Sequence, residues 1–141
     1  MTGNDATGPY ELRPIGTVRS MLTDPAIAPK QGDEGGAEAW LELDVSVRTA
    51  ARDLAPGDEV IVVTWLHRAR RDVLEVHPRD LASNPLRGVF STRSADRPNP
   101  IGLHRVTITA VEGTRIEVRE LEAIDGTPIL DVKPALGPRD R

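Results

Sequence analysis

The 141-residue chain contains no cysteine. This absence excludes disulfide bonds, thiolate metal sites and cysteine nucleophiles. The three histidines, His67, His77 and His104, lack a metal-ligand spacing such as HxxxH, so no metal site is predicted. Aromatic residues make up only 3% of the chain, which removes the stacking platforms of proteins that bind single-stranded nucleic acid.

Long hydrophobic runs are also missing from the sequence. No apolar run approaches the roughly 20 residues that a membrane-spanning helix needs. The first residues lack the basic start and apolar core of a secretory signal. The sequence therefore predicts a cytoplasmic protein without a membrane partner.

The net charge of −4 is unevenly distributed. Residues 60–105 hold eight basic and four acidic side chains, whereas the rest of the chain holds ten basic and eighteen acidic ones. All eight basic residues of this stretch are arginines, and a guanidinium binds a carboxylate or phosphate through two parallel hydrogen bonds. The stretch is therefore either an oxyanion-binding surface or an ordinary solvated one. The net negative charge of the whole chain argues against broad, sequence-independent binding of nucleic acid. A contact limited to the arginine-rich stretch remains open.

The pattern of apolar residues predicts an all-β fold with at most one short helix. We expect residues 1–9 to form a flexible tail and residues 10–141 to form a single domain, a small β-barrel with long loops. Alternation is clearest over Trp40–Val47, and the continuous apolar run Val60–Leu66 predicts a strand buried on both faces. One or two helical turns are predicted over Val47–Leu54. The other predicted strands are Ile15–Leu22, Val73–Val76, Gly88–Thr92, Leu103–Val111, Arg115–Leu121 and Ile129–Val132.

Residues 88–103, GVFSTRSADRPNPIGL, are the most constrained part of the sequence. Pro98 and Pro100 fix their own φ angles and push the residues before them towards extended geometry. We therefore expect a stiff extended stretch in which Arg97 and Asn99 project to one side. Such a stretch would hold polar groups in place for a ligand.

This central segment strongly resembles the signature of the TrmO-like (TsaA-type) family of S-adenosylmethionine-dependent methyltransferases. The segments PIGTVRS at 14–20 and DGTPILDVKP at 125–134 resemble the opening strand and the closing motif of the same family. The resemblance implies a homodimeric β-barrel enzyme with its cofactor pocket near the subunit interface. It also implies methylation of the threonylcarbamoyl-modified adenosine next to the anticodon of certain tRNAs.

The resemblance assigns roles to individual positions. The implied contacts of the S-adenosylmethionine cofactor are Lys30, Gln31, Gly32, His67, Arg68, Arg93, Leu103, Leu121 and Glu122. Arginine suits the cofactor's carboxylate, and a carboxylate such as Glu122 suits its hydroxyls or its cationic end. The residues predicted to act on the acceptor are Arg97 and Asn99, which would orient it, and Asp125, a possible proton acceptor that is first of all a turn residue.

Several positions depart from the family pattern. Lys30 stands where arginine is usual, no Ser-His pair precedes the buried strand, and alanine replaces the usual tyrosine after Pro134. These changes lie mostly on the side of the site that would bind the methyl acceptor. Two alternatives to tRNA methylation therefore remain: an enzyme of the same fold with a small-molecule acceptor, and a module that binds the cofactor without turnover.

Overall fold

The computed structural model describes residues 8–22 and 38–137. The strands of this part of the chain are β1 (Gly16–Arg19), β2 (Ala39–Leu43), β3 (Glu59–Trp65), β4 (Glu75–Val76), β5 (Arg87–Gly88), β6 (Ile101–Glu112), β7 (Arg115–Arg119) and β8 (Pro128–Pro134). Its helical segments are the short 3-10 turns η2 (Val45–Ala51), η3 (Pro78–Asp80) and η4 (Val89–Ser91). The predicted fold, rich in strands and poor in helix, is confirmed. The predicted cofactor contacts Lys30, Gln31 and Gly32, and most of the predicted tail, lie outside the described residues.

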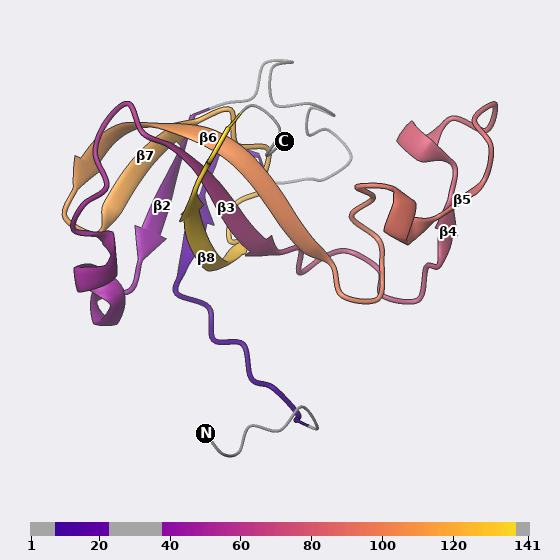
Figure 1. The fold of residues 1–141 in the computed structure, drawn as a ribbon, viewed down its shortest axis with the longest axis horizontal. Helices are drawn as coiled ribbons and strands as arrows, with labels where there is room; N and C mark the ends of the chain where they lie inside the picture. The colour runs from indigo at the N-terminus through magenta and orange to yellow at the C-terminus, as the bar shows by residue number, and fades with distance from the viewer. Residues whose placement is uncertain (1–7, 23–37, 138–141) are drawn as a thin grey trace.

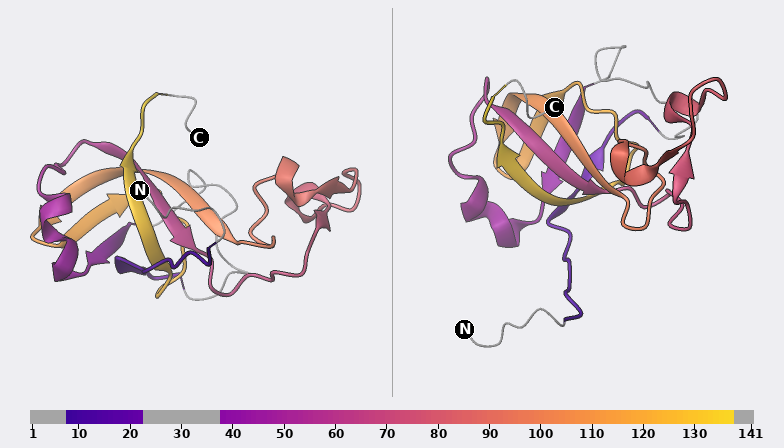
Figure 2. Two further views of the ribbon diagram at one scale, coloured as in Figure 1. Left: turned by 60° about the horizontal axis from the view of Figure 1, so that its bottom comes forward. Right: turned by 45° about the vertical axis from the view of Figure 1, so that its right-hand side comes forward.

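Six strands close into a barrel in the order β1-β2-β7-β6-β3-β8 (Figure 1). All neighbours are antiparallel, and β8 completes the ring by pairing with both β3 and β1. The chain between β3 and β6 leaves the barrel and forms a lobe that holds the small β4–β5 sheet (Figures 1 and 2). The lobe returns to the barrel directly before β6, so its base lies beside the end of β3.

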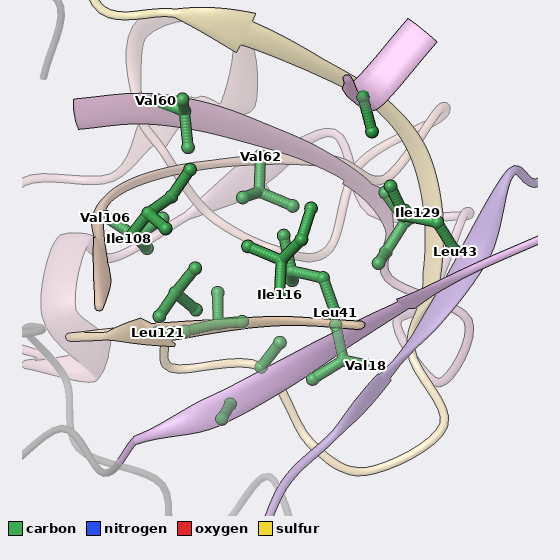
Figure 3. Close-up of a cluster of buried hydrophobic side chains, with 14 residues drawn as sticks. Val18, Leu41, Leu43, Val60, Val62, Val106, Ile108, Ile116, Leu121 and Ile129 are labelled. Atoms are coloured by element: carbon green, nitrogen blue, oxygen red, sulfur yellow. The ribbon is translucent and has the colours of Figure 1, made fainter. Parts of the chain in front are cut away.

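The inward-facing residues of the strands fill the barrel with apolar side chains (Figure 3). Val106 and Ile108 of β6 and Ile116 and Val118 of β7 are buried, as their alternation predicts. Ala110 is only partly buried, because the pairing of β6 with β7 shifts register between Ile108 and Ala110. Residues that alternate along each strand thus face the core and the surface in turn.

The predicted strand Trp40–Val47 is too long. The strand β2 ends at Leu43, and the side chain of Asp44 accepts a hydrogen bond of 3.1 Å from the backbone nitrogen of Ser46. This cap starts the 3-10 turn η2, so Val45 is 74% exposed instead of facing the core. The helical turns predicted over Val47–Leu54 are confirmed in this shifted position.

Three further strand predictions need correction. The strand β3 is buried on one face and partly exposed on the other, because its outer residues lie at the surface of a barrel rather than between two layers. The strand predicted over Val73–Val76 is reduced to the two residues of β4. Residues 89–91 form the turn η4 instead of a strand, since the backbone nitrogen and the hydroxyl of Thr92 both donate to the Val89 carbonyl at 3.0 Å.

Candidate functional site

A cavity of about 310 Å³ lies at the end of the barrel from which the lobe emerges. Three distant parts of the chain line it: residues 66–69 after β3, residues 95 and 96 in the lobe, and residues 122–124 and 127 before β8. We call it the inner cavity. It brings together three predicted cofactor contacts, His67, Arg68 and Glu122.

Backbone hydrogen bonds hold the turn after β3 against the base of the lobe. The Leu66 nitrogen donates to the Pro100 carbonyl at 2.8 Å, and the Arg97 nitrogen donates to the Arg70 carbonyl at 3.0 Å. The Arg70 nitrogen donates in turn to the Asp96 carboxylate at 2.8 Å. These ties fix the wall that carries His67 and Arg68.

The opposite wall is the loop between β7 and β8. Glu120 adopts a positive φ of 71°, which turns the chain inward after β7. Leu121 is fully buried in the apolar core, and the next residue, Glu122, lines the cavity with its oxygen Oε2 buried. The Thr127 hydroxyl donates to the Ile124 carbonyl at 2.7 Å and closes the loop. The cavity therefore combines apolar walls with the carboxylate of Glu122.

Asp125 lies in this loop but its carboxylate faces β1. The Ser20 nitrogen donates to Asp125 Oδ1 at 3.0 Å, and Arg19 Nη1 lies 3.8 Å from Oδ2. The backbone nitrogen of Asp125 also donates to the Leu22 carbonyl at 2.6 Å. These contacts are those of a turn residue, and its action as a proton acceptor remains a prediction.

The Pro98–Pro100 segment is bent, so the expected extended stretch is wrong. The Ile101 nitrogen donates to the Asn99 carbonyl at 2.7 Å, which closes a tight turn around Pro100. The side chains of Arg97 and Asn99 consequently have different partners. Arg97 Nη1 donates to the carbonyls of Thr92 and Ser94 at 3.0 and 2.8 Å, and Nη2 donates to that of Val89 at 2.8 Å.

Arg97 therefore clamps the turn that precedes it, and we expect Arg97→Met to loosen this turn. Methionine keeps the apolar stem but leaves the part-buried carbonyls of Thr92 and Ser94 without the guanidinium donor, at a cost of about 1–3 kcal/mol. Backbone amide exchange over residues 89–96 should accelerate while that of β7 stays unchanged. Unchanged exchange in the turn would contradict the clamp.

His104 lies on the inward-facing side of β6, where the charge of Arg93 acts on its ring. His104 Nε2 lies 2.8 Å from the Thr64 hydroxyl, and Gly102 leaves the room for this contact, because a Cβ there would overlap both groups. Burial, and secondarily the charge of Arg93, lowers the pKa of His104 to about 4. His104 is therefore neutral at physiological pH. Leu103, a predicted cofactor contact, faces outward and is 49% exposed.

Sequence reasoning counted Arg71 only among the eight arginines of residues 60–105 and gave Asp96 no role. In the structure Asp96 lines the inner cavity and Arg71 donates a hydrogen bond to Asn99. Both lie in the arginine-rich stretch, but their partners, Asn99 and the Arg70 nitrogen, are 26 to 28 residues away along the chain. No spacing rule connects residues across such a loop. Within the described residues, no group of three or more His, Asp or Glu side chains could hold a metal ion. Nor does any helix of that part of the chain have the length and apolarity of a membrane span.

Comparison with known proteins matches the chain to one family along most of its length. The family model of the tRNA-methyltransferase O N-terminal domain covers residues 17–141. A probable S-adenosyl-L-methionine-binding protein of Methanothermobacter thermautotrophicus is 40% identical over 123 residues, which cover 87% of this chain and 88% of the relative. The S-adenosyl-L-methionine-binding protein of Archaeoglobus fulgidus is 39% identical over 122 residues, 86% of each chain.

Solved structures agree with the sequence matches. A crystal structure of TrmO superposes with a TM-score of 0.76 at 29% identity and covers 94% of this chain. That of TrmO from Pseudomonas aeruginosa gives a TM-score of 0.73 at 29% identity, again over 94% of this chain. The chain spans 58–60% of the length of these two TrmO chains.

Proposed function

The chain belongs to the family of the tRNA-methyltransferase O N-terminal domain, and on that premise we propose that it is an S-adenosylmethionine-dependent methyltransferase. The observation that carries the proposal is the inner cavity, which brings His67 and Arg68 after β3 together with Glu122 before β8. The proposed acceptor is the N6 nitrogen of the threonylcarbamoyl-modified adenosine beside the anticodon of tRNA.

The residues of the inner cavity fit the chemistry of the cofactor. S-adenosylmethionine presents a planar aromatic adenine, ribose hydroxyls, a cationic sulfonium and a carboxylate. Leu66, Ala123 and Ile124 offer apolar surface for the adenine, and Glu122 offers an acceptor for hydroxyls or a counter-charge for the sulfonium. The guanidinium of Arg68 suits the carboxylate. A volume of about 310 Å³ is at the lower end of the range for small-molecule sites.

When bound, the cofactor supplies a methyl group activated by the sulfonium, and the protein's task is positioning. An in-line displacement needs the acceptor nitrogen about 3–3.5 Å from the methyl carbon. The clamp of Arg97 and the ties between residues 66–70 and 96–100 hold the cavity walls for this purpose. A urea-like nitrogen must lose its proton, for which a side chain such as Asp125 or a water molecule is required.

Arg93→Ala tests whether Arg93, which is not among the residues that line the inner cavity, nevertheless contacts the cofactor. If the guanidinium bonds the cofactor's carboxylate, affinity should fall by about 1.5–3 kcal/mol, or about ten- to 150-fold. Calorimetric titration with S-adenosylmethionine measures the change, and Arg87→Ala in the exposed strand β5 is the matched control. Equal affinities in both variants and the parent protein would remove this role from Arg93.

Transfer of a labelled methyl group to bulk tRNA that carries the modified adenosine tests the activity. Labelled product supports the proposal, and its absence with properly modified tRNA contradicts it. A cofactor-binding module without turnover is the second candidate, because the two archaeal relatives matched over most of their length are named only as binding proteins. That candidate predicts calorimetric binding without product from any acceptor. The net charge of −4 favours a third candidate, an enzyme of the same fold with a small-molecule acceptor.

We further propose a homodimer in the cytoplasm as the functional form. Large apolar side chains are exposed on the lobe, among them Leu74 and Phe90, which are 67% and 82% exposed. Such residues are common where a second subunit covers the surface. Light scattering on the purified chain should give twice the monomer mass of 15.3 kDa.

A further inference from the structure

A second cavity, of about 560 Å³, lies on the outside of the barrel. We call it the outer cavity. Its floor includes Trp65 of β3 and Ile101 of β6, which are cross-strand partners, and Leu130 of β8. These residues alternate with the buried Thr64 and Ile129, so they face outward. Tyr10 and Leu12, from the segment before β1, form one side.

Asn99 brings an amide side chain to the outer cavity, and Arg71 fixes its orientation. Arg71 Nη2 donates to Asn99 Oδ1 at 2.8 Å, and Nε donates to the Pro98 carbonyl at 2.6 Å. Because the amide oxygen accepts from Arg71, the amide nitrogen is the group left to meet a ligand, and it carries two N–H donors. The guanidinium of Arg71 also lies 5.2 Å from the centre of the Trp65 ring, so one residue positions both the amide and the indole.

The two cavities share their walls. Leu66 and Thr127 line the inner cavity, whereas their chain neighbours Trp65 and Pro128 line the outer one. A ligand in the outer cavity is therefore held at the same end of the barrel as the proposed cofactor.

We propose that the outer cavity binds a nucleobase, with Trp65 as the stacking surface, Asn99 as the hydrogen-bond donor and Arg71 as the positioning residue. A mostly apolar cavity of a few hundred Å³ with a few polar groups, here including the fixed amide of Asn99, is typical of a small-molecule site. A planar ring with an acceptor nitrogen on its edge satisfies both the indole and the amide donor, as unstacked RNA bases do in proteins. A single base stacks on a single tryptophan, so the low aromatic content of the chain does not exclude this site. In this proposal the outer cavity is the subsite for the methyl acceptor, and this assignment rests on the proposed function.

Adenosine titration followed by NMR tests the site, with the two tryptophan indole N–H signals as probes. The Trp65 signal should shift and saturate, whereas that of Trp40, on the opposite strand β2, should stay in place as an internal control. Asn99→Asp keeps the acceptor for Arg71 but removes the N–H donor, and should weaken binding by about tenfold or more, equivalent to about 1.4 kcal/mol. Arg71→Met should have a similar effect. Arg70→Met is the matched control, because Arg70 instead pairs with Asp72 at 3.1 Å.

The titration is repeated in the Ala69→Trp background, where the inner cavity is obstructed and adenosine cannot act from there. A Trp65 shift that persists and depends on Asn99 supports the proposal. No saturable shift, an undiminished shift in Asn99→Asp, or a shift lost in Ala69→Trp would each overturn it. So would a change of the Trp65 signal with protein concentration alone, because a second copy of the chain would then occupy the cavity.

Calorimetry with S-adenosylmethionine separates this inference from the proposed function. Cofactor affinity should be equal in the parent protein, Asn99→Asp and Arg71→Met, because these residues do not line the inner cavity. Failure of the parent protein to bind the cofactor would contradict the proposed function and leave the nucleobase site standing on its own titration. A matching loss of cofactor affinity in both variants would instead contradict the separation of the two sites.

Discussion

Replacing Ala69 by tryptophan is expected to abolish measurable binding of S-adenosylmethionine. Ala69 is partly buried and lines the inner cavity, so the cavity is the open space into which a large side chain extends. An indole in a space of about 310 Å³ leaves no room for the adenine and the sulfonium together. A loss of about a thousandfold, or about 4 kcal/mol, is the expected scale for a blocked site. Calorimetry measures it directly.

Ala82→Trp provides the matched control for this variant. Ala82 is exposed in the lobe and lines neither cavity, so the same change there should leave cofactor affinity unaltered. Thermal unfolding should show that both variants are folded, since neither position belongs to the apolar core. Parent-like affinity in Ala69→Trp would mean that the cofactor binds elsewhere, and the proposed function would lose the cavity that supports it.

The barrel strands were largely predictable because each carries its own signal. Alternation in β6 and β7 places Val106, Ile108, Ile116 and Val118 in the core, as found. The errors in the predicted strands arose where local hydrogen bonds compete with strand pairing. Asp44 ends β2 by capping a turn, and Thr92 closes another where a strand was expected. Apolar periodicity does not report such side-chain contacts with the backbone.

The site was predictable only in part, and for a different reason. The family resemblance pointed to His67, Arg68 and Glu122, which do line one cavity. The prolines correctly marked a constrained segment, but its shape depends on the Arg97 clamp and on the contacts of Arg71 with Pro98 and Asn99. These contacts join residues across the lobe. Their partners become apparent only once β3 and β6 pair and bring the two ends of the lobe together.

Lowering the pH from 7 to 4 is expected to destabilise the protein through His104 alone by about 3 kcal/mol. Burial lowers the pKa of His104 from 6.5 to about 4 in the folded chain. Between these values the unfolded chain binds the proton and the folded chain does not. The free energy of unfolding therefore falls as the pH is lowered through this window, and the contribution is fully lost below about 4.

His104→Gln is the variant that isolates this effect, because glutamine can still bond the Thr64 hydroxyl but does not titrate. Urea unfolding at several pH values should give a shallower loss of stability for the variant than for the parent protein. The difference between the two pH profiles should reach about 3 kcal/mol at pH 4. His77→Gln serves as control, since that histidine lies in the exposed lobe beside the Asn84 carbonyl. Parallel profiles for parent and His104→Gln would show that His104 is protonated as readily in the folded chain as in the unfolded one. The description of His104 as a neutral partner of Thr64 at the end of the barrel would then be wrong.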